Sequence, residues 1–215
     1  MFLTREPARV FLLSPARIGG PRSEMLLNSK AEFDLAIRLR LGTASVGEAY
    51  SFISGLYFRG KLAYAEAFAA PPAGVPPTLV IVPGLGLVPP GVLWNAHQLR
   101  EAGAIAVEEN NEAFRGPLMR DAALLDRQAG PDCRCMLLGS IATSKYTGPL
   151  LDIFGDRLLF PSDFVGRGDM SRGGLMLRCA RTGEELSYVC LVGANRRGRR
   201  PAKLKPWRGL EVPRS

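Results

Sequence analysis

Short apolar runs that end at a proline or glycine constrain the fold of this chain more than any other feature. They occur at Arg9–Leu13, Thr78–Val82 and Cys133–Leu138, and in each case a proline or glycine follows within two residues. Runs of this length, closed by turn-forming residues, predict buried strands. A shorter run at Leu158–Phe160 predicts one more strand.

The segments between these runs have the apolar spacing of helices. The predicted helices lie after Ser29, across Val46–Phe68, near Gly91–Glu101, over Ala113–Gln128 and over Thr143–Phe154. Gly55 and Gly60 interrupt the second of them. Near the end of the chain, Gly173–Ala180 and Leu186–Val192 flank a glycine-containing turn and predict a β-hairpin. We therefore expect a mixed α/β fold: a single domain with a central mixed sheet flanked by helices and a C-terminal β-hairpin.

Positive charge is concentrated near the C-terminal end. The chain has 28 Lys and Arg against 20 Asp and Glu residues, for a formal net charge of +8. Seven basic residues and no acidic residue lie between Gly193 and Arg208, so the rest of the chain is nearly neutral. We divide the chain into an α/β domain, residues 1–192, and a basic tail, residues 193–215. The tail is expected to be extended or disordered when free, because its glycine and prolines disfavour a regular helix.

Composition excludes several classes of protein and of site. No apolar run reaches the roughly 18 residues that a membrane-spanning helix needs, and the N-terminus lacks the pattern of a secretory signal. The four cysteines lack the spacing of a zinc site. His97 is the sole histidine and has no adjacent nucleophile, so we expect it to be exposed. We expect a cytoplasmic protein with reduced thiols, no metal, no cofactor and no membrane partner.

Four segments carry recognisable motifs in a fixed order. They are Phe11–Arg17, Tyr57–Tyr64 together with Ile81–Pro89, Gly139–Tyr146, and Ser171–Arg178. In this order they resemble the YaaA family, bacterial proteins associated with resistance to peroxide stress. The corresponding family motifs are Ser-Pro-Ala-Lys, a Tyr-x-Gly helix with a strand ending in Ser-Gly-Leu-Tyr-Gly-Leu-x-x-Pro, Asn-Leu-Ala-Ser-x-Glu-Tyr, and Ala-Arg-Gly-Leu-Met-Ala-Arg.

The resemblance is that of a distant relative and has specific departures. Arg17 stands where the family has lysine, Pro83 where it has serine, and Gly139 and Lys145 where it has asparagine and glutamate. The resemblance implies a single α/β domain with a positively charged cleft and DNA binding. Related domains also occur beside base-modifying enzymes that act on 7-deazaguanine nucleotides.

Two groups of candidate ligand-binding residues follow predicted strands. Ser14 and Arg17 come directly after the first strand, and Ser140, Lys145 and Tyr146 come after the third. The carboxyl ends of strands in α/β sheets are where ligands bind. Arg17 can hold a phosphate or carboxylate through two hydrogen bonds, or it can be a surface arginine beside a proline turn.

A third group, Tyr57, Arg59 and Lys61, belongs to a predicted helix. At helical spacing Tyr57, Lys61 and Tyr64 share one face, which can stack bases and neutralise phosphate. The alternative is that the tyrosines edge the core and the cations are solvated beside them.

A fourth group lies in the glycine-rich segment Gly166–Gly174, which we expect to be a loop. Its backbone can form a nest of N–H groups for an anion, with Arg172 adding charge and Asp169 orienting an arginine or acting as a base. The alternative is a flexible loop before the hairpin. Gly84-Leu85-Gly86 is too short for a dinucleotide fingerprint, and we expect it to form a tight turn close to a ligand or to a neighbouring helix.

The basic tail is the candidate nucleic-acid-binding segment. Its basic residues with one tryptophan suit phosphate neutralisation and a single stacking contact. Alternatives are a solubilising tail, a segment that folds back on its own domain, and a ligand of acidic lipid. The candidate residues are Arg196, Arg197, Arg199, Arg200, Lys203, Lys205 and Trp207.

Two functions follow from these observations. The first is a YaaA-like nucleic-acid-binding protein linked to oxidative stress or DNA protection, with DNA ahead of RNA as the expected partner. The alternative is an enzyme that acts on a nucleobase, nucleoside or nucleotide, a small molecule held in a cleft lined by the motif loops. The residues assigned to that cleft are Ser14, Arg17, Lys61, Ser140, Asp169 and Arg172. No catalytic triad identifies a reaction, and a module whose tail docks on an acidic protein is a third possibility.

Overall fold

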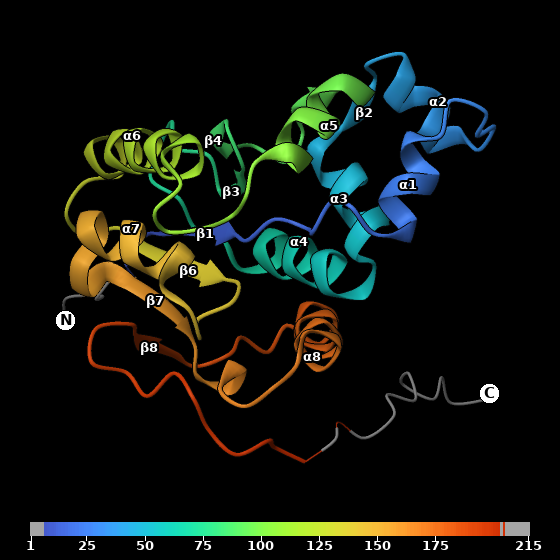
Figure 1. Ribbon diagram of the computed structural model, residues 1–215. Coiled ribbons are helices and arrows are strands. Elements are labelled where there is room, and N and C mark those ends of the chain that lie inside the picture. The colour runs from blue at the N-terminus through green and yellow to red at the C-terminus, as the bar shows by residue number, and fades with distance from the viewer. Residues whose placement is uncertain (1–6, 203, 205–215) are drawn as a thin grey trace, which may run out of the picture.

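A central sheet of six strands organises residues 7–202 and Leu204, which the computed structural model describes (Figure 1). The strand order is β4-β3-β1-β6-β7-β8. The four inner strands β3, β1, β6 and β7 are parallel, and β4 and β8 are antiparallel at the two edges. The bounds are β1 (Arg9–Leu13), β3 (Thr78–Val82), β4 (Gly86–Val88), β6 (Arg134–Leu138), β7 (Leu158–Pro161) and β8 (Tyr188–Cys190).

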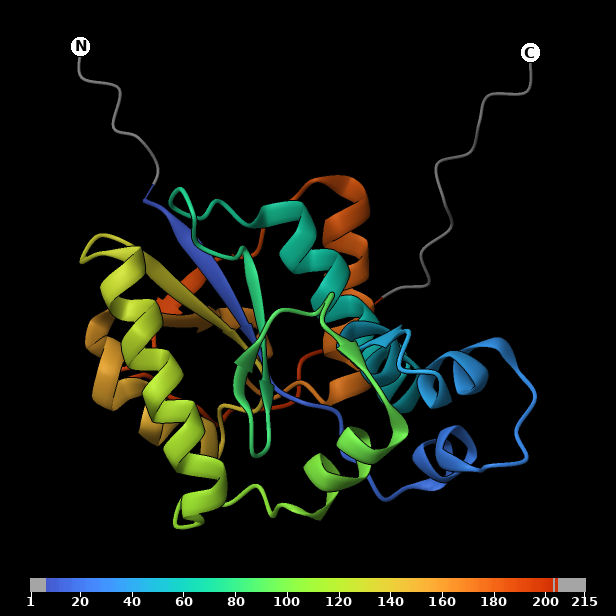
Figure 2. The same cartoon turned by 90° about the horizontal axis from the view of Figure 1, so that it is seen from above.

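Helices cover both faces of this sheet, with α6 and α7 on one face and α4 and α8 on the other (Figure 2). The bounds are α1 (Pro21–Leu27), α2 (Asp34–Arg40), α3 (Val46–Ser54), α4 (Leu56–Phe68), α5 (Ala96–Ala104), α6 (Glu112–Ala129), α7 (Ser144–Phe154) and α8 (Asp169–Thr182). Two short 3₁₀ turns, η1 (Gly155–Arg157) and η2 (Ser162–Phe164), flank β7. The predicted mixed α/β single domain is confirmed.

The inner strands form because they are apolar on both faces. All five residues of β3 are buried, as are the last four of β1 and of β6. A parallel strand that helices cover on both sides reads as a continuous apolar run rather than an alternating one. The proline and glycine that follow each run then end the strand, so these three predicted strands match the observed ones within one residue.

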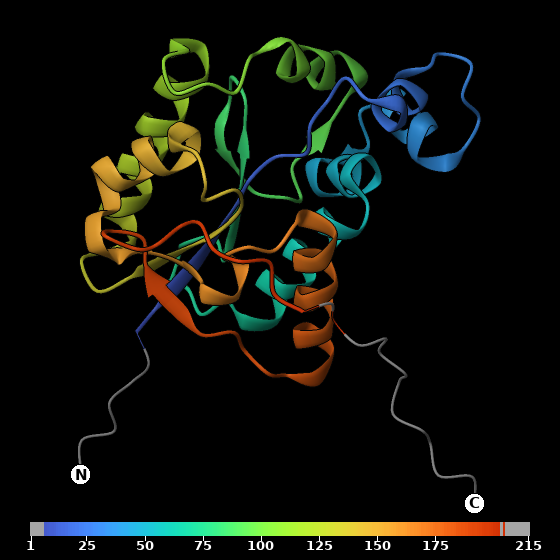
Figure 3. The ribbon, with the colours of Figure 1, turned by 60° about the horizontal axis from the view of Figure 1, so that its bottom comes forward.

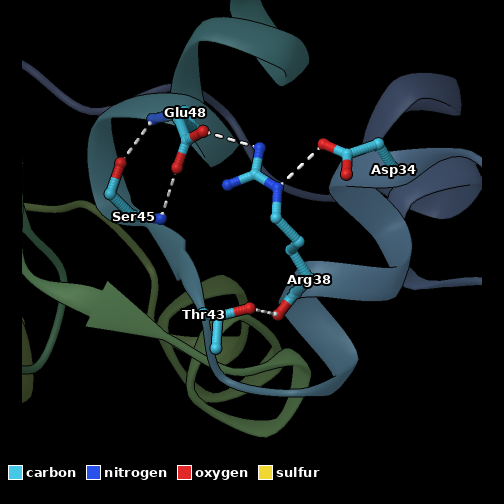
Figure 4. A network of polar contacts seen from close by, with 5 residues as sticks. All are labelled: Asp34, Arg38, Thr43, Ser45 and Glu48. Carbon is cyan, nitrogen blue, oxygen red and sulfur yellow. Dashed lines mark hydrogen bonds and ion pairs between the residues drawn. The ribbon is translucent and has the colours of Figure 1, made fainter.

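A smaller lobe lies beside the main sheet and contains α1, α2, α3, α5 and a two-stranded sheet of β2 (Ala44–Ser45) and β5 (Leu93–Trp94). A network of polar contacts fixes its geometry (Figure 4). The Ser45 hydroxyl accepts from the Glu48 backbone N–H while the Glu48 carboxylate accepts from the Ser45 N–H, which is a capping box for α3. Arg38 bridges Glu48 and Asp34, at 2.6 and 2.8 Å, and so ties α2 to α3.

Glycine decides two features of the predicted helix at residues 46–68. At Gly55 the backbone has a φ of +60°, which ends α3 and starts α4 in a new direction. Gly60 instead stays inside α4 and faces Gly173 of α8. A Cβ on Gly60 would lie 2.6 Å from the Gly173 carbonyl oxygen, so the two helices approach more closely than side chains would allow (Figure 3).

The predicted C-terminal β-hairpin is wrong, and so is the predicted loop at residues 166–174. Residues 169–182 form α8, which ends at Gly183 with a φ of +73°. Of its two central glycines, Gly173 serves a helix contact rather than a nest, because it packs against the backbone of α4. Only the second half of the expected hairpin is a strand, β8, and it pairs with β7.

The other turn prediction is confirmed. Gly84 and Gly86 have φ values of +81° and +90° in the β3–β4 connection. A Cβ on Gly86 would lie 2.6 Å from the Pro117 carbonyl oxygen of α6, so the turn passes close to a neighbouring helix. None of the helices in the described part of the chain combines the length and the hydropathy that crossing a bilayer requires.

Candidate functional site

The main candidate site is a pocket of about 700 Å³ at the carboxyl edge of the parallel strands. From β1 the chain proceeds to β3 on one side, and it later reaches β6 on the other side of β1. Ligands in open α/β sheets bind at such a reversal of strand order. The backbone N–H of Ser14 donates to the Leu138 carbonyl at 3.1 Å and holds the ends of β1 and β6 together there.

Most of the predicted ligand-binding residues meet at this pocket. Seven of them line it: Ser14, Arg17, Tyr57, Ser140, Lys145, Tyr146 and Asp169. Lys61 and Arg172 are buried directly behind it, through contacts with Ser14 and Asp169. The four motif segments therefore converge on one place in the fold.

Lys61 is the least expected of these residues, because its side chain is only 1% exposed. Its Nζ lies 2.8 Å from both the carbonyl oxygen and the Oγ of Ser14, and 4.1 Å from the centre of the Tyr57 ring. Within the described residues it forms no ion pair. Burial lowers the pKa of Lys61 to about 7. Two smaller effects oppose each other, since Asp169 raises this pKa and Arg172 lowers it.

Arg172 joins two strand-end segments behind the pocket. Its Nε and Nη2 donate to the Phe164 carbonyl at 3.2 and 2.8 Å, and its Nη1 donates to the Gly139 carbonyl at 3.5 Å. The same Nη1 lies 3.7 Å from Asp169, one turn earlier on α8. Arg172 therefore fixes the loops that follow β6 and β7 and partly neutralises the carboxylate that lines the pocket.

The lining carries both signs of charge and two aromatic rings. Arg17 is exposed, Lys145 is half-buried, and neither forms an ion pair within residues 7–202. Glu108 and Asp169 contribute carboxylates. Tyr57 and Tyr146 add ring surface. Burial raises the pKa of Tyr57 to about 12, so it is a neutral phenol at physiological pH.

Two helices begin at the pocket. Lys145 is the second residue of α7, and Asp169 is the first residue of α8. Neither helix has a side-chain hydrogen bond at its N-cap, Thr143 or Gly168. Backbone N–H groups of a first turn have no partner inside the helix, and together with the helix dipole they favour an anion.

The predicted stacking face of α4 is wrong. Lys61 and Tyr64 both point into the protein. The Tyr64 hydroxyl forms hydrogen bonds with Tyr188 Oη at 2.8 Å and with the Leu186 N–H at 2.9 Å. Only Tyr57 reaches the pocket. Arg59 is exposed and lines a different hollow, beside α1 and α3, so it is not part of the site.

The described part of the tail lies against the domain. It has no regular secondary structure, and Arg196 donates to the Thr147 hydroxyl of α7 at 3.2 Å. The backbone of Arg199 packs against Gly166, just before α8. Arg197, Arg199 and Arg200 are exposed, with no acidic partner within the described residues. Lys203, Lys205 and Trp207 lie outside the described residues.

Three other expectations can be compared with the structure. His97 is exposed, as predicted, and its Nδ1 lies 3.1 Å from a carboxylate oxygen of Glu101. All four cysteines are free. Within residues 7–202 and Leu204, no group of His, Cys, Asp and Glu side chains is arranged to hold a metal ion.

Sequence reasoning missed the wall of the pocket opposite the sheet. It is formed by the end of α3 and the segment that follows α5, with Ile53 and Glu108 among the lining residues. No motif or spacing marks these residues. A second omission had a usable signal: Gly139 directly follows a strand, and a Cβ there would lie 2.8 Å from Ser14 Cβ.

The chain was also compared with protein-family models, curated proteins and solved structures, and it matches none of them.

Proposed function

We propose that the strand-end pocket binds a nucleotide, either free or as one unit of a nucleic acid. The observation that carries this proposal is the composition of the lining. Arg17, Lys145 and the first turns of α7 and α8 suit a phosphate. Glu108 and Asp169 suit the N–H donors of a base, and the tyrosine rings suit its face.

Both parts of a nucleotide are needed to account for this set of residues. A bare anion has no use for the two carboxylates, and a neutral nucleoside has no use for the two cations. A pocket of about 700 Å³ is within the range of small-molecule sites and is large enough for a nucleotide. The convergence of the four motif segments supports the same conclusion.

Calorimetric titration with adenosine and guanosine monophosphates, the two nucleosides and inorganic phosphate tests the proposal. We expect at least one nucleotide to bind more tightly than its nucleoside and than phosphate. Arg17→Met and Lys145→Met should each weaken binding roughly 10- to 150-fold, because a charge-assisted hydrogen bond contributes roughly 1.5–3 kcal/mol.

Arg59→Met is the matched control, since Arg59 is exposed on α4 but lies outside the pocket. It should bind as the wild type does. The proposal fails if no nucleotide binds at millimolar concentration, or if Arg59→Met and Arg17→Met lose the same affinity.

A second candidate function, binding of a nucleic-acid backbone, is favoured by the exposed arginines of the tail. Arg197, Arg199 and Arg200 carry three positive charges within four residues. Each phosphate contact on a single strand contributes about 0.7 to the slope of log affinity against log salt concentration. Serine at all three positions should therefore lower that slope by about 2, measured by fluorescence anisotropy with a labelled single-stranded oligonucleotide.

The control for this measurement removes three exposed arginines from elsewhere on the domain. If that control lowers the slope as much as the tail variant, the tail has no special role. Parallel titrations with DNA and RNA oligonucleotides of the same sequence identify the preferred partner. The control residues are Arg40, Arg59 and Arg127.

A further inference from the structure

The contact between Ser14 and Lys61 has the geometry of an activated nucleophile. Ser14 lines the pocket, whereas Lys61 lies behind it. The Nζ of Lys61 contacts two oxygen atoms of Ser14, the backbone carbonyl oxygen and Oγ. Both Nζ–oxygen distances are 2.8 Å. A serine hydroxyl that faces a ligand and has a buried base within hydrogen-bond distance is the arrangement that nucleophilic catalysis requires.

The surroundings of Lys61 favour its neutral form. Its Nζ is enclosed by Ser14, the Tyr57 ring at 4.1 Å and the Phe58 ring at 5.3 Å. The charged groups that affect it from α8 are Asp169 and Arg172, which have opposite signs and lie 3.7 Å from each other. A neutral amine can donate one N–H to the Ser14 carbonyl and accept the Oγ proton with its lone pair.

The backbone on the other side of Ser14 restricts its side chain. A Cβ on Gly139 would lie 2.9 Å from Ser14 Oγ, so the glycine leaves just enough room for the hydroxyl. Gly139 in turn is held by the hydrogen bond from Arg172 to its carbonyl. Ser14 Oγ is therefore confined between a base and a fixed segment of backbone, which is the preorganisation expected of a reacting group.

From this geometry we propose that Ser14 is an acyl-accepting nucleophile and Lys61 its general base, acting on an ester carried by a nucleotide. The inference rests on the proposed function, because it assigns a reaction to the same pocket. Ser14 Oγ attacks the ester carbonyl carbon and passes its proton to Lys61 Nζ. The carbon–oxygen bond to the nucleotide then breaks, and the departing oxygen takes that proton.

Water completes the cycle. It gives a proton to Lys61 Nζ and attacks the acyl-serine carbon, and Ser14 Oγ leaves and recovers the proton. The products are a carboxylic acid and a nucleotide with a free hydroxyl. Every step is a proton or acyl transfer, so the reaction needs neither an oxidant nor a reductant.

Labelling with a fluorophosphonate tests the nucleophile without knowledge of the substrate. We expect one equivalent of label on the peptide that contains Ser14, and none in Ser14→Ala. Lys61→Met should slow labelling by 10² to 10⁴-fold, the usual contribution of a general base. Lys30→Met, which removes an exposed lysine, is the control and should label at the wild-type rate.

The pH profile of the wild type gives an independent readout that a merely structural lysine would not affect. The labelling rate should rise with pH to a plateau above about 7, where Lys61 loses its proton. This pH profile remains decisive even if Lys61→Met does not fold, because it is measured on the wild type. The nucleophile proposal is refuted if labelling falls on another residue, if Ser14 is not labelled, or if the rate has no inflection between pH 5 and 9.

Nucleotide titration of the same samples separates the two proposals. If Ser14→Ala and the wild type bind a nucleotide equally and neither is labelled, only the nucleophile proposal fails. If Ser14 is labelled with the expected pH profile and no nucleotide binds, the proposed ligand is wrong and the nucleophile stands. A p-nitrophenyl ester with an anionic acyl group should then be hydrolysed by the wild type and not by Ser14→Ala.

Discussion

The contact between α4 and α8 holds the two halves of the site together, and a single methyl group should disturb it. In Gly173→Ala the new Cβ would lie 2.7 Å from the Leu56 carbonyl oxygen and 2.8 Å from Tyr57 Cα. Both atoms belong to the backbone of α4, so no rotation of a side chain relieves the overlap. The helices must move apart, which also displaces Tyr57 and Lys61 from the end of β1.

The neighbouring residue provides a matched control. In Gly174→Ala the new Cβ would meet only Leu204 Cδ1, at 3.8 Å, which is an ordinary contact. Both substitutions gain the roughly 1 kcal/mol by which alanine exceeds glycine inside a helix. The difference between the two variants therefore isolates the cost of the overlap, which we put at about 1–3 kcal/mol.

Urea unfolding followed by circular dichroism measures this difference, provided that the dependence on urea concentration is the same for both variants. In thermal unfolding, Gly173→Ala should melt about 2–12 °C below Gly174→Ala, since 1 kcal/mol corresponds to roughly 2–4 °C for a domain of this size. Nucleotide affinity should fall in the first variant and not in the second. Equal stability of the two variants would show that α4 and α8 are not in close contact at Gly173, and the reasoning would be refuted.

The remaining predictions concern protons, a buried hydroxyl and the thiols. The hydrogen bond from Arg38 lowers the pKa of Glu48 to about 2, so the stability lost in Glu48→Gln at pH 7 should disappear as the pH falls from about 4.5 towards 2, as urea unfolding can measure. Burial lowers the pKa of Lys61 from 10.5 to about 7; the wild type should therefore gain stability relative to Lys61→Met as the pH rises from 7 to 10.5, and a constant difference would contradict this. Tyr64→Phe leaves the partly buried backbone N–H of Leu186 without its acceptor and should cost about 1–3 kcal/mol in the free energy of unfolding. Of the four thiols, half-exposed Cys190 should react first with Ellman's reagent, and the other three should need denaturant.

The sequence was sufficient for the inner strands and insufficient for α8, for a physical reason. A strand covered on both faces must be apolar throughout, so Thr78–Val82 is recognisable without knowledge of its neighbours. In contrast, residues 173–180 mix apolar and polar residues in a way that fits a strand or a helix. Their conformation is decided by the approach of Gly173 to the backbone of α4, a contact more than 100 residues away in sequence.

The same distinction applies to the candidate site. Ser14, Ser140 and Lys145 could be found because parallel strands bring their carboxyl ends to one edge of the sheet. Glu108 could not, because its place depends on how the smaller lobe packs against that edge. Arg59 lies near Tyr57 in sequence, which suggests a place in the site, but the helix turns it towards solvent.

Lys61 connects the stability of the fold to its chemistry. Burying a protonated amine with no carboxylate beside it costs free energy, and an apolar side chain of similar volume would avoid that cost. Within the described residues no carboxylate lies within ion-pair distance of Lys61. Asp169, which would favour its charged form, is offset by Arg172 at 3.7 Å. A close carboxylate would stabilise the folded protein but would keep the amine protonated, and a protonated amine cannot accept the Ser14 proton. An uncompensated lysine beside a pocket-lining serine is therefore poor for stability and suited to catalysis, and this combination is what the proposed reaction requires.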